Sequence, residues 1–268
     1  SVEAVFRLYP VTDVIHFAAD SNVDRSIKLP DSTIENNVAA TTNLLMSCRK
    51  QGFNKFVMVS TDEVYGPAIQ EPGDLVPRAF NEKDPVKPCN PYAASKLACE
   101  GIAIAFSNTY GINISITRGT NTFGPWQYTT KLIPRSVKLL LEGKDIELYG
   151  RGEATREWLP VEDHVSGVHA AWMLGDNQEI YNIGSGVRFS GIGIARIILD
   201  GLNLNTNRVR FIEDRPGHDM AYAIDSRKSM RHLKWANGAG DALQRHECIR
   251  GMIMDTARWY WNNHDDTC

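Results

Sequence analysis

Two groups of reactive side chains stand out in the sequence. Thr61, Asp62 and Glu63 place a hydroxyl and two carboxyl groups in a row, and Tyr92 stands four residues before Lys96. Residues four apart share one face of a helix, so the phenol and the ammonium would be neighbours. An ammonium beside a phenol stabilises the phenolate and lowers the tyrosine pKa from about 10 towards neutrality. Tyr92 is therefore a candidate general base for an alcohol; the alternative is a packing tyrosine beside a surface lysine.

The adjacent carboxyl groups of Asp62 and Glu63 could serve as acid and base on one substrate. Neighbouring side chains leave an extended backbone in opposite directions, so a turn is needed to aim both at one molecule. In different environments the two groups can hold different protonation states. A solvated Asp-Glu turn is the alternative. The apolar strand that we predict directly before them, at 55–61, makes the catalytic interpretation equally favoured.

The elements that must position these groups alternate between strands and helices. Apolar runs at 13–19, 55–61 and 112–117 predict buried strands, and apolar faces at 34–50 and 92–110 predict helices. This alternation is typical of an α/β fold with a Rossmann-like, doubly wound parallel sheet.

Ligands of such sheets bind beyond the carboxyl ends of the strands. The stretches that follow the three predicted strands, 18–21, 60–63 and 119–125, are rich in polar or small residues. Asn90 is placed as an N-cap and Pro91 as the first residue of the helix that carries the phenol and the ammonium. We therefore expect one ligand crevice at this edge of the sheet.

A smaller α/β lobe is expected after residue 125. Its helices and strands are predicted at 131–143, 146–149, 161–174, 179–183, 209–212 and 241–262. We divide the chain into a domain at 1–125 and a second at 126–268 that is partly interleaved with the first. A phosphate-binding glycine turn with its preceding strand is expected in a complete dinucleotide domain, and nothing before residue 13 supplies it.

The composition restricts the class of protein further. The chain has 268 residues, 43% of them hydrophobic, and a net charge of −3, which gives no reason to expect nucleic acid or an anionic membrane as partner. No apolar run reaches the roughly 20 residues that span a bilayer. The five cysteines are odd in number and widely spaced, so we expect reduced thiols, a cytoplasmic location and no metal site.

Several motifs resemble those of the extended short-chain dehydrogenases and, within them, the dTDP-glucose 4,6-dehydratase family. STDEVYG at 60–66 and NPYAASK at 90–96 carry the resemblance. Further matching segments, in the same order as in the family, are HFAADSNVDRSI (16–27), KLIP (131–134), TREWLPVEDH (155–164), YNIG (181–184) and DRPGHDMAYAID (214–225). Related epimerases and decarboxylases usually lack an aspartate where Asp62 stands.

The resemblance implies a lyase that uses NAD. Tyr92, supported by Lys96 and Thr61, would take the proton of the sugar 4-hydroxyl while hydride passes from C4 to NAD⁺. Glu63 would remove the C5 proton, and Asp62 would protonate the leaving 6-hydroxyl. Hydride would then return to C6. This reaction requires one base, one acid and one redox pair.

The resemblance also implies the binding residues. The first domain would hold NAD and the second mainly the nucleotide sugar. Residues expected to line the NAD or the sugar are Phe17, Ala18, Ala19, Asp20, Ser21, Asn36, Asn121, Lys131 and Leu132. Arg156, Arg215 and His218 would face the diphosphate, where arginine suits phosphate oxygens. The alternatives are a surface ion pair for Arg156 and a solvated loop position for His218. His16 is expected to be a core histidine rather than a ligand.

Other implications concern the partners and extent of the protein. Members of the family often form homodimers through a four-helix bundle, to which 34–50 and 92–110 would contribute. The resemblance implies that roughly 70 residues, including the glycine turn, precede Ser1. A chain without them would bind NAD weakly. The alternatives are a related nucleotide-sugar epimerase or decarboxylase, and an inactive, truncated nucleotide-sugar-binding module. Asn22, Asn36 and Ser190 depart from the family pattern and leave the substrate base open.

Overall fold

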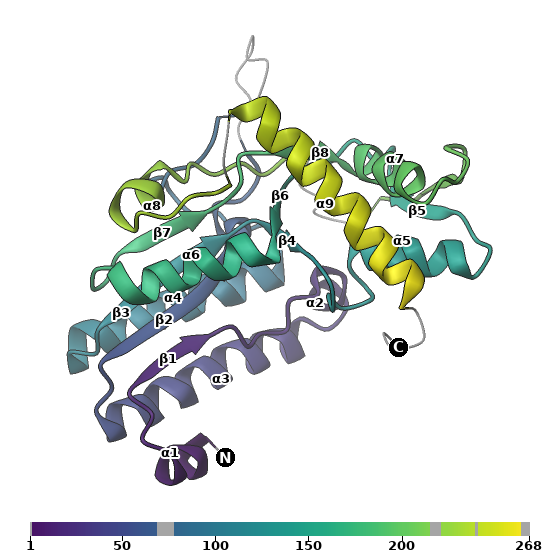
Figure 1. Ribbon diagram of the computed structural model, residues 1–268. Coiled ribbons are helices and arrows are strands. Elements are labelled where there is room, and N and C mark those ends of the chain that lie inside the picture. The colour runs from purple at the N-terminus through teal and green to yellow at the C-terminus, as the bar shows by residue number, and fades with distance from the viewer. Residues whose placement is uncertain (1, 69–77, 215–220, 239–240, 264–268) are drawn as a thin grey trace.

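The computed structural model describes residues 2–68, 78–214, 221–238 and 241–263. Its first lobe contains a four-stranded parallel sheet in the order β1-β2-β3-β7, shown in Figure 1. The strands are β1 (Asp13–His16), β2 (Lys55–Thr61), β3 (Ile114–Gly119) and β7 (Ile180–Ile183). Since every neighbouring pair is parallel, the carboxyl ends lie along one edge, and the predicted fold class is confirmed.

The central strand β2 is buried along its whole length because helices cover both faces of the sheet. Phe56 and Met58 pack into a core with α3 (Pro30–Gln51) and α4 (Pro91–Tyr110). Val57 and Val59 point the other way, into a core shared with α6 (Val161–Leu174). This alternation explains the continuous apolar run in the sequence, since both faces of the strand need apolar side chains.

Helix α4 carries two of the proposed catalytic groups, and its start is fixed by local chemistry. The Asn90 side chain accepts a 2.8 Å hydrogen bond from the backbone N–H of Ala93, and Pro91 is the first helical residue. The helix ends before Gly111, whose φ of +69° favours glycine. The predicted cap at Asn90 is therefore confirmed.

The second lobe surrounds a separate apolar core. It contains α5 (Leu132–Leu141), α7 (Gly191–Gly201), α9 (Ala242–Asn262), the parallel pair β5 (Ile146–Tyr149) and β9 (Val209–Ile212), and the sheet of β4 (Asn121–Phe123), β6 (Thr155–Pro160) and β8 (Arg188–Ser190). Strand β7 pairs with β3 in the first sheet, and helix α6 packs against that sheet, although both elements follow residue 125. The two lobes are thus interleaved, while the division at residue 125 stays a prediction.

Several elements were not predicted. They are the helices α1 (Val2–Leu8), α2 (Val23–Lys28), α7 and α8 (Arg227–His232), the 3₁₀ turn η1 (Asp62–Tyr65), and the strands β4, β6 and β8. Strand β1 also ends at His16, before the predicted end at residue 19. In the loop that follows, the backbone N–H of Asp20 bonds to the side chain of Asn37 on α3, at 2.7 Å. His16 itself is buried and bonded to Thr41 at 3.0 Å, as expected of a core histidine.

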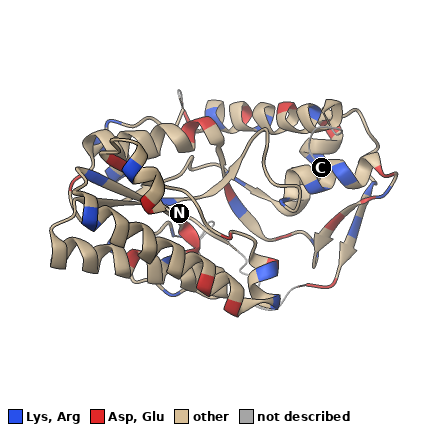
Figure 2. Cartoon of the chain, turned by 90° about the horizontal axis from the view of Figure 1, so that it is seen from below, with Lys and Arg blue, Asp and Glu red and all other residues tan. Residues whose placement is uncertain are grey.

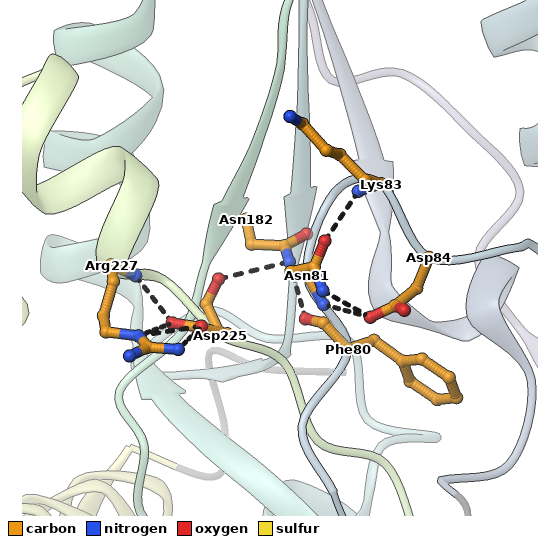
Figure 3. A network of polar contacts seen from close by, with 7 residues as sticks. All are labelled: Phe80, Asn81, Lys83, Asp84, Asn182, Asp225 and Arg227. Carbon is orange, nitrogen blue, oxygen red and sulfur yellow. Dashed lines mark hydrogen bonds and ion pairs between the residues drawn. The ribbon is translucent and has the colours of Figure 1, made fainter.

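A polar network around Asn182 ties segments that are distant in sequence, as Figure 3 shows. The Asn182 amide donates to the carbonyls of Phe80 (3.0 Å) and Asp225 (3.3 Å). Its oxygen accepts a 2.8 Å hydrogen bond from the Tyr65 hydroxyl at the end of η1. Strand β7 therefore supports the turn that carries the two carboxyl groups.

Charged residues of both signs are mixed along the elements (Figure 2). Within the described residues, no helix combines the length and apolar character that crossing a membrane would require. The same part of the chain holds no group of three or more His, Cys, Asp or Glu side chains arranged to bind a metal ion.

Candidate active site

A cleft of about 470 Å³ lies at the carboxyl ends of β1, β2 and β3. Most of the side chains singled out in the sequence line it: Phe17, Ala19, Ser21, Thr61, Asp62, Glu63, Tyr92, Lys96, Asn121, Lys131 and Leu132. They come from five elements and the loops between them, and parallel strands bring them to one edge of the sheet. The predicted crevice is therefore present.

The turn η1 places Asp62 and Glu63 in different surroundings. Thr61 precedes the turn, and its hydroxyl accepts a hydrogen bond from the backbone N–H of Glu63 at 3.3 Å. Asp62 is only 2% exposed. Glu63 is half-buried, and its Oε2 accepts a 2.8 Å hydrogen bond from the Asn90 amide. The two carboxyl groups thus line one cleft with unequal access to water.

The surroundings of Asp62 favour its protonated form. Burial raises the pKa of Asp62 well above its ordinary value, and the charges of Glu63 and Glu157 raise it further. The charge of Arg156 and a hydrogen bond from Thr61 act in the opposite direction without reversing the shift. A carboxyl group held neutral in this way can donate a proton, which is the property required of a general acid.

Tyr92 and Lys96 lie on the same face of α4 and are both buried, at 9% and 3% exposure. The expectation that Lys96 lowers the pKa of Tyr92 is wrong for this structure. Burial raises the pKa of Tyr92 above its ordinary value, the charges of Glu63 and Asp62 add to this, and a hydrogen bond with Thr61 opposes it. The phenol sits beside two carboxyl groups, which disfavour a phenolate.

The ammonium of Lys96 is itself influenced by its burial. Burial lowers the pKa of Lys96, while Cys99 and the carboxylate of Glu100 oppose that change. Glu100 also forms a buried, two-pronged ion pair with Arg118, with distances of 2.7 and 3.1 Å. Arg118 in turn lies over the Tyr65 ring at 4.6 Å. This arrangement links the helix of Lys96 to the turn of Asp62.

The structure places Asn36 away from the lining of the cleft, and its contact with a cofactor stays a prediction. Its side chain is exposed on α3 and bonds to Ser32 at 3.4 Å, outside the lining of the cleft. The neighbouring Asn37 is buried instead, and its amide donates to Ser95 on α4 at 2.8 Å and to the backbone oxygen of Asp20 at 3.1 Å. One residue is a rotation of about 100° on a helix, which exchanges the buried and exposed faces.

The remaining predicted residues are placed less directly. Ala18 and Asp20 belong to the loop after β1 but are not among the residues that line the cleft. Their contacts with a cofactor stay predictions. Arg215 and His218 lie outside the described residues.

A second cavity, of about 220 Å³, adjoins the cleft. The residues shared by the two cavities are Glu63, Asn121, Lys131, Leu132 and Trp158. Arg156 lines the second cavity, and its guanidinium lies over the Tyr222 ring at 4.7 Å. The cleft that holds the carboxyl groups therefore opens into a space lined by an arginine.

Several lining residues were missed by the reasoning from sequence. Tyr149, Trp158 and Phe189 line the second cavity, and His164 lines the cleft. Tyr149 ends a predicted strand, which is a signal for a ligand-facing position. His164 falls within a predicted helix, where sequence alone does not tell which face meets the sheet.

The fold and the site define an extended short-chain dehydrogenase: a parallel sheet whose strand ends gather a Tyr-x-x-x-Lys pair, a hydroxyl and two carboxyl groups. A family model described as GDP-mannose 4,6 dehydratase matches residues 1–240. The dTDP-glucose 4,6-dehydratase of Streptomyces griseus is 39% identical over 223 residues, 83% of this chain and 66% of that protein.

Two further comparisons cover nearly the whole chain. The Escherichia coli dTDP-glucose 4,6-dehydratase is 33% identical, covering 99% of this chain and 77% of that protein. DesIV, the Streptomyces venezuelae dTDP-glucose 4,6-dehydratase solved with NAD bound, superposes with a TM-score of 0.88 at 36% identity, covering 98% of this chain and 78% of that one. The chain belongs to the dTDP-glucose 4,6-dehydratase family.

Proposed function

We propose that this protein is an NAD-dependent hydro-lyase that converts a nucleoside-diphosphate glucose, dTDP-glucose in the first instance, to the 4-keto-6-deoxy sugar. The observation that carries the proposal is the pairing of Asp62 and Glu63 in one cleft with Tyr92. A dehydration needs a proton donor for the leaving hydroxyl and a base for the neighbouring carbon. The buried Asp62 and the more accessible Glu63 suit these two roles.

The residues of the cleft fit a nicotinamide dinucleotide. Lys96 would hold the ribose beside Tyr92, and Phe17, Ala19 and Ser21 would line the bound cofactor at the end of β1. The buried Nε2 of His164 has no hydrogen-bond partner within the described residues, so this cleft offers an acceptor for a ligand. When bound, NAD⁺ supplies the hydride acceptor for C4, the hydride donor for C6 and a positive charge that favours the phenolate.

The steps at the sugar follow from the positions of the side chains. Tyr92 takes the proton of the 4-hydroxyl, assisted by the hydroxyl of Thr61. The resulting 4-ketone acidifies the C5 proton, which Glu63 removes. Asp62 donates its proton to the 6-hydroxyl, which leaves as water. Glu63 then returns its proton to C5 as C6 receives the hydride that left C4. The proton that Tyr92 took replaces the one that Asp62 gave, so the net reaction is the loss of one water.

The second cavity supports the nucleotide part of the proposal. Arg156 has a guanidinium fork that suits the diphosphate oxygens, and Lys131 lies where the two cavities meet. Tyr149 offers an aromatic face beside them. We assign the diphosphate to Arg156, and we keep Arg215 and His218 as further proposed contacts.

We also propose a homodimer in the cytoplasm. The outer face of α4 carries small, exposed residues at Ala94, Ala98, Gly101 and Ala105, which would let a second helix pack closely. Ile34 and Met46 on α3 are exposed apolar side chains beside it. Cys48, Cys89, Cys99 and Cys248 are free thiols, which supports a reducing compartment.

The test is turnover of dTDP-glucose and, separately, of UDP-glucose by the purified protein supplied with NAD⁺. We expect a 4-keto-6-deoxy product, seen by its absorbance in alkali and by its mass. A C4 epimer or a pentose product would instead support the related epimerases or decarboxylases. Binding of nucleotide sugar without any turnover would support a non-catalytic binding module.

A further inference from the structure

His164 on α6 is a buried acceptor in the wall of the cleft. Its Nδ1 lies 2.8 Å from the hydroxyl oxygen of Thr122. Its Nε2 is buried and has no hydrogen-bond partner among the residues that the structure describes. Burying such a nitrogen costs free energy unless a ligand forms a hydrogen bond with it, because its lost hydration is otherwise not replaced.

The hydrogen bonds of Thr122 favour one of the two neutral forms of the His164 ring. The Thr122 hydroxyl donates its single proton to the backbone oxygen of Thr120 at 3.2 Å. In that arrangement it accepts from His164, so Nδ1 holds the ring proton and Nε2 presents a lone pair. Burial lowers the pKa of His164 to about 4, which keeps the ring neutral near pH 7. Nε2 is thus an acceptor and not a donor.

The surroundings of Nε2 show which part of a ligand could reach it. It lies against the end of β3, where a Cβ on Gly119 would come within 2.7 Å of it. The Phe17 ring meets the imidazole edge-on, with ring centroids 6.2 Å apart. The same cleft contains Thr61 and Tyr92, so a group bound at Nε2 would be close to the reacting centre.

We propose that Nε2 of His164 accepts a hydrogen bond from the carboxamide N–H of bound nicotinamide. This inference rests on the proposed function, since it requires NAD in the cleft. The carboxamide is the N–H donor that the nicotinamide ring itself carries. His164 is then a specificity-determining residue that orients the ring over the site of hydride transfer.

The test compares NAD⁺ with 3-acetylpyridine adenine dinucleotide, in which a methyl group replaces the carboxamide NH₂. Dissociation constants of both are measured calorimetrically with the unmodified protein and with His164→Phe. For each protein, the preference is the dissociation constant of the analogue divided by that of NAD⁺. We expect this ratio to be about five- to tenfold larger for the unmodified protein than for the variant, because one hydrogen bond to a buried acceptor is lost. An equal preference in both proteins would overturn the inference.

Two further variants keep the test informative. His169→Phe makes the same change at an exposed position on α6 and should leave the preference for NAD⁺ unaltered. His164→Gln keeps an acceptor oxygen and should retain part of the preference, which covers the case in which the Phe variant does not fold. A Gln variant that discriminates less than the folded Phe variant would contradict the proposed hydrogen bond. If the unmodified protein binds neither dinucleotide, the proposed function fails, and this inference fails with it.

Discussion

Asn90 donates a 2.8 Å hydrogen bond to Oε2 of Glu63 while its own oxygen caps the helix that carries Tyr92. One side chain therefore sets the position of the proposed C5 base relative to the proposed 4-hydroxyl base. The two groups act on adjacent carbons of one sugar, so their spacing must be held closely. Asn90 thus serves the chemistry although it transfers no proton.

Replacing Asn90 by serine separates its two roles. Serine remains a good N-cap, so we expect thermal unfolding to change little. Its shorter side chain would no longer hold Glu63, and exchange of the C5 proton with solvent deuterium should slow by about tenfold. If the Asn90→Ser variant exchanged that proton at the normal rate, the hydrogen bond would have no part in positioning Glu63.

Tyr92→Phe should abolish the first oxidation. The substitution removes only the hydroxyl, and loss of a general base typically slows a step by about 10²- to 10⁴-fold. Formation of NADH in a single turnover is the measurement. Tyr110→Phe is the matched control because it makes the same change at the exposed end of α4. Normal oxidation by the Tyr92 variant would refute its assignment as base.

Asp62→Asn should slow the loss of water more than the oxidation. An amide has no acidic proton to give to the leaving hydroxyl, whereas the 4-hydroxyl can still be deprotonated by Tyr92. NADH and a 4-keto-glucose nucleotide should therefore accumulate, seen by absorbance and mass spectrometry. An equal decrease in both steps would show that Asp62 is not the acid.

The same Asp62→Asn variant should gain stability relative to the unmodified protein as the pH rises. The pKa of Asp62 is raised in the folded state, so its favourable contribution is complete below the unfolded pKa and is lost as the pH approaches the folded value. The difference in unfolding free energy should grow by at most about 1.4 kcal/mol per pH unit in that interval. Thermal unfolding of both proteins is measured between about pH 5 and pH 8, the range in which most proteins are stable. A difference that is independent of pH would show that Asp62 is not held protonated.

Gly101→Lys should convert the proposed dimer to a monomer. A side chain added at Gly101 meets no atom within 4 Å in the single chain, so the fold should tolerate it. Gly251 on α9 has the same open surroundings, and Gly251→Lys is the matched control. Light scattering after size-exclusion chromatography should give half the mass for the first variant alone. An unchanged mass would exclude α4 as the interface.

Much of the fold could be predicted from local patterns. The apolar runs that became β2, β5 and β9 and the helix α6 were placed correctly because both their pattern and their boundaries are local. Strand β1 was predicted too long because the apolar run continues past His16 into a loop, which bonds to Asn37 on α3. The order of strands in the sheet was left open, as it arises from packing and not from spacing.

The site was predicted as a set of residues but not as an electrostatic environment. The positions of Asp62 and Tyr92 followed from motifs, yet the raised pKa of Tyr92 depends on burial and on carboxyl groups brought in by a turn. The exchange of Asn36 for Asn37 shows that contacts between α3 and α4 decide which helical face is buried. His164 was missed because the sequence does not show that its Nε2 is buried without a hydrogen-bond partner among the described residues.

The network around Asn182 also affects when the chain can fold during translation. Asn182, which bonds to both, is synthesised 117 residues after Tyr65 and 102 residues after Phe80. A nascent chain halted before β7 would present β3 with an open edge, a state prone to aggregation. Because such distant pairings form slowly, the protein should acquire its native shape only near the end of translation, and shortened products should depend on chaperones.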